Sequence, residues 1–134
     1  MTAILQSPEF MESPPESATD LGGGIRRTLL GHDDKILMAK VWFEKGAVGE
    51  VHTHPHSQVS YVISGKFSVE VNGETRVLDE GGCFFVPSMA PHGAVCLEPG
   101  VLIDVFSNDE ICYGYCSPCN PRTTAGAQCG PELS

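Results

Sequence analysis

Residues 66–78, KFSVEVNGETRVL, consist of two alternating runs that flank the pair Asn72-Gly73. Type I′ turns prefer this pair because both central residues adopt positive φ angles, which asparagine and glycine tolerate. Within each run, apolar and polar side chains alternate with the period of a half-buried strand. The segment therefore predicts a β-hairpin and restricts the chain to folds built on antiparallel strands.

Other short strand-like segments surround this hairpin and are separated by glycine and proline turn signals. These segments are 21–31, 35–46, 58–65, 83–87, 93–97 and 101–106, with Gly65 closing one of them and predicted turns at 79–82 and 98–100. Such closely spaced strands with no convincing helical period are typical of sandwiches and barrels. We expect an all-β barrel or jelly roll of about eight strands.

The length of 134 residues favours a single domain. Residues 1–20 are rich in Pro, Glu and Ser and predict a flexible N-terminal arm, followed by a barrel over 21–106. Residues 107–134 form a Cys-rich C-terminal tail. Its four cysteines fit incidental thiols or a zinc site, while a radical iron–sulfur centre would need a far larger barrel. These cysteines are Cys112, Cys116, Cys119 and Cys129.

The net charge of −9 and the pI of about 4.8 argue against a nucleic-acid partner, which needs a clustered basic surface. The N-terminal residues have no basic leader of the kind that opens a secretory signal. No run approaches the roughly 20 apolar residues of a membrane span. We therefore expect a cytoplasmic protein with a small-molecule substrate, no nucleic acid and no membrane partner.

The segment HTHPHSQ, residues 52–58, holds three of the five histidines of the chain. Neutral imidazole is the commonest metal ligand in proteins near pH 7. On a strand, His52 and His54 would point to the same side and could bind one ion. Pro55 should bend that strand. Whether His56 is a further ligand or only a neighbour depends on this bend.

Two segments resemble the motifs of the cupin family. Residues 46–65 carry Gly46, the pair His52-x-His54, Gln58 and Gly65 at the spacing of the first motif. Residues 81–96 carry the glycine, proline and histidine of the second motif, and the Asn-Gly hairpin lies between the two motifs. The residues of the second motif are Gly81, Pro87 and His92.

The resemblance implies a single-domain double-stranded β-helix, or jelly-roll barrel. It also implies one divalent transition metal, Zn, Ni, Fe or Mn, held by four ligands, with His56 as a possible addition. The four ligands are His52, His54, Gln58 and His92. The chain departs from the family at two positions, because Gln58 replaces the usual glutamate and Met89 the usual glycine.

Gln58 contributes a neutral oxygen where a glutamate would contribute a negative charge. Three neutral imidazoles and an amide leave a divalent ion at its full charge, which favours polarising a carbonyl or acidifying a bound water. This ligand set favours Lewis-acid chemistry over oxygen activation.

Asp104 lies within an apolar strand, VLIDVF, where a carboxylate is costly unless it is paired or functional. Two interpretations are open. Asp104 pairs with an arginine and stabilises the barrel, or it points toward the ion and moves a proton.

The wider pattern, LGGGIRR, HTHPHSQVSYVISGKF, VPSMAPHG and DVFS, is similar to the small cupins that linearise unsaturated uronates in pectin and alginate breakdown. This resemblance implies a lyase or isomerase that opens an unsaturated sugar acid, with Asp104 and Phe106 in the active site, and a homodimer. Glu110 stands where that group has an arginine. Arg26 or Arg27 would then replace that arginine, or the substrate differs.

Three other functions remain open from the sequence. The first is an aromatic polyketide cyclase of an antibiotic pathway, with an apolar mouth formed by Trp42, Phe67, Phe84, Phe85 and Met89. The second is a small cupin dioxygenase, since three-histidine iron sites occur in that class. The third is a non-catalytic sugar-binding cupin.

Overall fold

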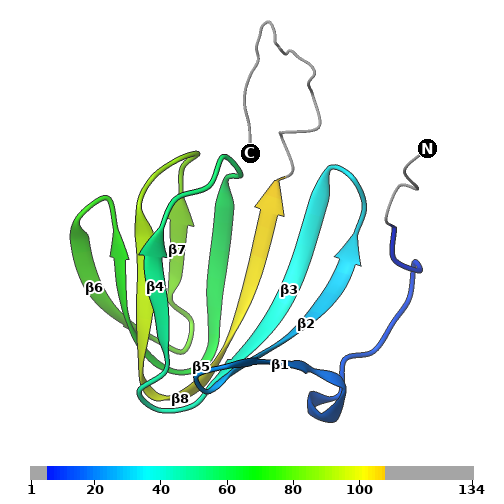
Figure 1. Cartoon of the computed structure of the whole chain (residues 1–134), viewed down its shortest axis with the longest axis horizontal. Helices are drawn as coiled ribbons and strands as arrows, with labels where there is room; N and C mark the ends of the chain where they lie inside the picture. The colour runs from blue at the N-terminus through cyan, green and yellow to red at the C-terminus, as the bar shows by residue number, and fades with distance from the viewer. Residues whose placement is uncertain (1–5, 108–134) are drawn as a thin grey trace, which may run out of the picture.

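A curved antiparallel sheet contains every strand in the part of the chain that the structure describes, residues 6–107 of a computed structural model (Figure 1). This part also contains one short 3₁₀ helix, η1, and confirms the all-β, single-domain prediction. The elements are η1 Pro15–Ser17, β1 Thr19–Gly22, β2 Ile25–His32, β3 Ile36–Phe43, β4 Val48–His52, β5 Gln58–Val71, β6 Glu74–Asp79, β7 Cys83–Val86 and β8 His92–Ser107.

The two long strands, β5 and β8, pair with each other and organise the sheet. The first part of β5 pairs with β7 and its second part with β6. In the same way, the first part of β8 pairs with β4 and its second part with β3. Two layers result, one containing β2, β3 and β7 and the other β4 and β6, with both long strands passing from one layer to the other. This is how strands that bend between sheets form the corner of a jelly roll.

The bend in both long strands occurs where Gly65 meets Gly100. Gly65 has a φ of +86°, and a Cβ atom at this position would lie 2.4 Å from the Gly100 Cα and 2.5 Å from the Pro99 carbonyl oxygen. The register of the two strands is also irregular between residues 62 and 67. The predicted strand end at Gly65 and the predicted turn at 98–100 were therefore wrong. Both glycines lie inside continuous strands, at the place where the backbones approach too closely for a side chain.

The Asn72-Gly73 hairpin is confirmed. Asn72 has a φ of +54° and Gly73 a φ of +82°, and the flanking residues Val71 and Glu74 are register partners. The core lies between the two layers beneath this hairpin. Phe67 is fully buried there and contacts Phe43 edge to face, with 5.1 Å between the ring centroids. The other buried members of the cluster are Ala47, Val62, Val69, Cys96 and Leu102.

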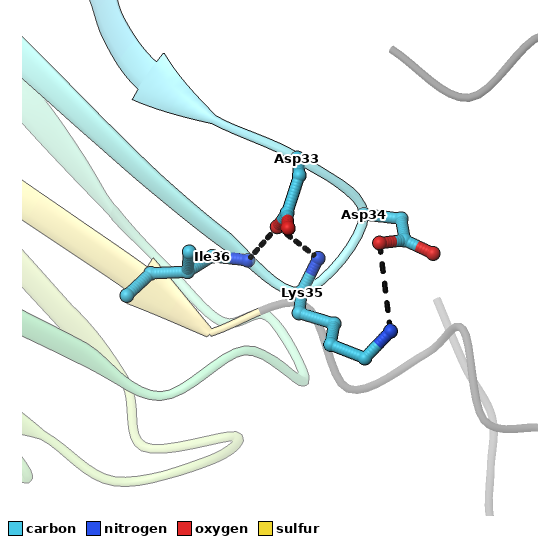
Figure 2. A network of polar contacts seen from close by, with 4 residues as sticks. All are labelled: Asp33, Asp34, Lys35 and Ile36. Atoms are coloured by element: carbon cyan, nitrogen blue, oxygen red, sulfur yellow. Dashed lines mark hydrogen bonds and ion pairs between the residues drawn. The ribbon is translucent and has the colours of Figure 1, made fainter. Parts of the chain in front are cut away.

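A side-chain hydrogen-bond pattern closes the turn between β2 and β3 (Figure 2). An Asp33 carboxylate oxygen accepts hydrogen bonds from the backbone N–H groups of Lys35, at 2.8 Å, and Ile36, at 3.1 Å. These two donors hold the pKa of Asp33 below its usual value. The half-buried Asp34 and the exposed Lys35 form an ion pair beside the turn.

The segment before β2 contacts the sheet through backbone groups. Ser7 donates its N–H to the His32 carbonyl at 2.9 Å, and Arg26 donates to the Pro15 carbonyl at 3.1 Å. The strand β1 lies along the lower edge of the view in Figure 1. The arm, barrel and tail boundaries stay a prediction, and the four tail cysteines lie outside the described residues. None of the helical structure in residues 6–107 is long and apolar enough to cross a membrane.

Candidate metal centre

A cavity of about 250 Å³ brings together seven of the residues that the sequence singles out. Strand register explains the convergence, because β4 pairs His52 with His92, while β5 and β8 pair Gln58 with Phe106. Register partners in neighbouring strands point to the same face of a sheet. The cavity is lined by Phe43, Gly49, His52, His54, Gln58, Phe84, His92, Gly93, Ala94, Leu102, Asp104 and Phe106.

Three imidazoles meet at one point of this cavity. One ring nitrogen from each of His52, His54 and His92 lies within 4.8 Å of the others, so the three are positioned to bind one metal ion. The ring centroids of His52 and His92 are 4.4 Å apart, and those of His54 and His92 are 4.6 Å apart. His92 is buried, whereas His52 is exposed at the opening.

Backbone carbonyls fix the tautomer of all three rings. The Nδ1 atoms lie 2.8 Å from the Glu50 oxygen for His52, 2.9 Å from the His56 oxygen for His54, and 3.0 Å from the Ala90 oxygen for His92. A carbonyl accepts only, so each Nδ1 donates its proton to that carbonyl. Each neutral ring then carries its lone pair on Nε2, the arrangement that backbone-bonded metal ligands adopt.

The amide oxygen of Gln58 joins this group of acceptors. It lies 3.2 Å from the His54 Nε2 atom. The Gln58 Nε2 group donates to the Ser60 hydroxyl at 2.8 Å, which leaves the amide oxygen facing the imidazoles. Two acceptor atoms that face each other without a proton between them repel, and a cation between them would remove this repulsion.

The Nε2 atom of His92 provides a second indication of a cation. It is buried and has no hydrogen-bond partner among residues 6–107, a situation that costs free energy unless another group satisfies the atom. Burial lowers the pKa of His92, and the neighbouring His52 and His54 lower it further, so the neutral form that binds metals is favoured. The residues therefore fit a divalent transition metal with imidazole ligands.

The loop 53–57 positions His54, which corrects the expectation that His52 and His54 lie on the same strand. The strand β4 ends at His52 and β5 begins at Gln58. Met89 donates its N–H to the His54 carbonyl at 2.8 Å, and Ser88 donates to the Pro55 carbonyl at 2.7 Å. His54 therefore reaches the cavity from a loop, and residues of the second motif hold that loop in place.

His56 and Met89 border the three-histidine group. The ring of His56 lies beside that of His54, with 5.6 Å between centroids, and its role as a ligand stays a prediction. Met89 has a φ of +67°. This left-handed conformation explains why glycine is usual at the position, since a side chain there carries a steric cost.

Asp104 pairs with a serine and with no arginine among the described residues. The Ser60 hydroxyl donates to the Asp104 carboxylate at 2.6 Å, and the two residues are register partners. Burial raises the pKa of Asp104 above its usual value, although the bond from Ser60 acts in the opposite direction. The carboxyl group can therefore hold a proton at a higher pH than an exposed aspartate.

Sequence reasoning missed Ser60, which is fully buried. Its hydroxyl accepts from Gln58 and donates to Asp104, so one atom connects the amide and the carboxylate. The signal was present, because Ser60 follows Gln58 by two positions and shares its face of β5.

The residues proposed for an apolar mouth do not gather around the histidines. Phe84 lines the cavity, but Phe67 is in the core and Trp42 lines a different cavity. Phe85 and Met89 are exposed, and neither lines the histidine cavity. Phe106 does line it, with its ring centroid 5.8 Å from that of His54.

Imidazoles from two separate segments converge on one point inside a two-layered antiparallel barrel. This combination is typical of the cupin class. The cupin domain family matches residues 40–106, and the chain belongs to this family.

Among its relatives is the pectin degradation protein KdgF of Dickeya dadantii (strain 3937), 43% identical over 90 residues, which cover 66% of this chain and 82% of that protein. The structure is also similar to KdgF from Halomonas sp., with a TM-score of 0.66 and 42% identity over 68% of this chain and 84% of the other. An RmlC-like cupin from Shewanella frigidimarina NCIMB 400 gives a TM-score of 0.73 and 48% identity over 78% of this chain and 95% of the other.

Proposed function

We propose that this cupin is a metal-dependent enzyme that opens the ring of a 4,5-unsaturated uronate to give the open-chain keto acid. The supporting observation is the position of one proton-holding carboxyl, Asp104, on the wall of the cavity into which the three imidazoles and the Gln58 oxygen point. The similarity to two proteins named KdgF, one of them described as a pectin degradation protein, supports the same class of substrate.

The reaction is an isomerisation, so no atom is gained or lost. The hydroxyl at C1 loses its proton, the bond between C1 and the ring oxygen breaks, and C1 becomes an aldehyde. The ring oxygen remains on C5 as an enolate, which becomes a ketone when C4 accepts the proton that the C1 hydroxyl lost. One carboxyl that first accepts and then returns a proton is sufficient for these steps.

Asp104 is the group proposed to move this proton. Burial raises the pKa of Asp104, so its carboxyl accepts a proton more readily than an exposed aspartate does. Ser60 holds the carboxylate by one hydrogen bond and leaves its second oxygen available. Phe106, on the same wall, is proposed to orient the sugar ring and exclude water from it.

A divalent ion held by His52, His54, Gln58 and His92 would supply Lewis acidity toward a substrate oxygen. Its identity among Zn, Ni, Fe and Mn belongs to the proposal, as does the homodimer.

The polyketide cyclase is less well supported than uronate opening. Of the five residues proposed to form its apolar mouth, four do not line the histidine cavity, and Phe84 alone does. A dioxygenase stays a prediction that oxygen consumption would test. A non-catalytic sugar-binding cupin stays a prediction that binding without turnover would support.

The test is a turnover assay with 4,5-unsaturated galacturonate and protein reconstituted with each of the four metals. Loss of the ultraviolet absorbance of the double bond should exceed the uncatalysed rate, with formation of a keto acid and no uptake of oxygen. Asp104→Asn should lower kcat by about 10²- to 10⁴-fold while metal content stays at the wild-type level. Turnover at the uncatalysed rate with every metal would contradict the proposal.

A further inference from the structure

A second cavity, of about 380 Å³, adjoins the histidine cavity. The two share Asp104 and Phe106, which form a common wall. The second cavity extends from this wall across β3 to β2. Its lining consists of Leu21, Arg27, Leu29, Leu37, Ala39, Val41, Asp104 and Phe106.

Strand register places Arg27 on the same face of the sheet as the common wall of Asp104 and Phe106. Arg27 is the partner of Val41 in β3, and Val41 is the partner of Leu102 in β8. Leu102 itself lines the histidine cavity. Neighbouring strands are about 4.8 Å apart, so the Cα atom of Arg27 lies on the order of 10 Å from that of Leu102. A long side chain at this distance can reach a ligand that also contacts the shared wall.

Arg27 is the one lysine or arginine among the described residues that line either cavity. Its guanidinium makes no hydrogen bond or ion pair within the described part of the chain. An arginine with all its donors available is suited to bidentate binding of a carboxylate. In a chain of net charge −9, an anionic ligand needs such a local cation.

The neighbouring Arg26 provides a contrast. It points to the opposite face of the sheet, where its guanidinium lies 5.7 Å from the Trp42 ring centroid and donates to the Pro15 carbonyl. It lines a separate cavity that contains none of the three histidines. Arg26 is therefore engaged in the fold, and it is a matched control for Arg27.

We infer that Arg27 binds the carboxylate of the substrate, and that the substrate spans both cavities with its reacting carbons toward Asp104 and the histidines. The inference rests on the proposed function, since it assigns the acid group of that substrate. It supplies the anion recognition that the sequence left open, from β2 rather than from position 110, which lies outside the described residues.

The test measures binding rather than turnover, with saturated D-galacturonate and its neutral methyl ester as probes. Each is titrated by NMR into the zinc-loaded full-length chain, as wild type, Arg27→Gln, Arg27→Lys and Arg26→Gln. The wild type should bind the acid more tightly than the ester. Arg27→Gln should weaken acid binding by about 10- to 100-fold and leave ester binding unchanged, because a charge-assisted pair is lost. Arg27→Lys should keep part of the preference and Arg26→Gln all of it.

Two results would overturn the inference: a wild type with no preference for the acid, or a preference that survives in Arg27→Gln. Circular dichroism confirms that each variant is folded, and Arg27→Lys provides the comparison if the glutamine variant is not. If the preference depends on Arg27 but unsaturated uronate is not turned over, the anion site stands and the proposed reaction is wrong.

Discussion

The Nε2 atom of His54 and the Oε1 atom of Gln58 face each other at 3.2 Å, and both are hydrogen-bond acceptors. Their other polar atoms are already bonded, to the His56 carbonyl and to the Ser60 hydroxyl. This arrangement of lone pairs supports the proposed cation, and the neutral amide would leave the charge of that cation undiminished.

Gln58→Glu should bind the metal at least as tightly as the wild type but turn over more slowly. The carboxylate adds an anionic ligand, which reduces the net charge of the centre, and it cannot donate to Ser60. A decrease in kcat of about 10- to 100-fold is expected from the weaker polarisation of substrate. Calorimetric metal titration and steady-state kinetics measure the two quantities. Wild-type kcat in this variant would show that amide neutrality has no role.

Ser60→Ala should destabilise the fold, because it removes one acceptor and one donor from buried partners. The expected loss is about 1–3 kcal/mol in the free energy of unfolding, measured by urea denaturation. Ser64→Ala is the control on the same strand, since its hydroxyl makes no hydrogen bond with the described part of the chain, and it should change stability by less than about 0.5 kcal/mol. Equal effects at the two positions would argue against a bridging role for Ser60.

Asp104→Asn should stabilise the metal-free chain at neutral pH. The folded pKa of Asp104 is raised by burial, so the folded chain holds its proton longer than the unfolded chain does as pH rises. Stability is therefore lost with rising pH, from the unfolded pKa near 4 up to the folded pKa, at about 1.4 kcal/mol for each unit by which the two differ.

Asparagine does not ionise, so the stability of the variant relative to the wild type should be constant below about pH 4 and increase above it. Urea denaturation of both proteins over this pH range measures the difference, and the histidines cancel because both proteins contain them. A difference that does not change with pH would show that the pKa of Asp104 is not raised.

Gly65→Ala should prevent folding or cost more than about 3 kcal/mol, because its Cβ would overlap the backbone of β8. Gly73→Ala is the control, with a similar positive φ of +82° but nothing within 4 Å of the added Cβ. Its cost should be only about 1–2 kcal/mol from the left-handed backbone. Thermal unfolding compares the two variants, and similar melting temperatures would contradict the role of Gly65 as the contact point of the bend.

Much of the candidate site could be predicted because two segments resemble the motifs of the cupin family. The pair His52-x-His54, Gln58 and His92 was identified from two motifs, and the Asn72-Gly73 turn from residues that tolerate positive φ. The bend at Gly65 could not be predicted, because glycine and proline near residue 99 signal a turn locally. Only pairing between distant strands shows that both positions lie inside continuous strands.

The recognition of the substrate acid group was also beyond the sequence. Arg26 and Arg27 were equal candidates there, and adjacent residues of a strand point to opposite faces. Which face bears the cavity depends on the register of β2, β3 and β8, which is a tertiary property.

Metal content gives the most direct test of a cation shared by imidazoles from two segments. The full-length chain, purified without chelator and then saturated with zinc, should contain one ion per chain by elemental analysis. His92→Ala and His54→Ala should each lower metal affinity by at least about 10- to 100-fold, and His32→Ala, outside the cavity, should retain the wild-type content. A wild-type chain that binds no zinc, nickel, manganese or iron, or a His92→Ala variant that binds as tightly as the wild type, would contradict the shared site.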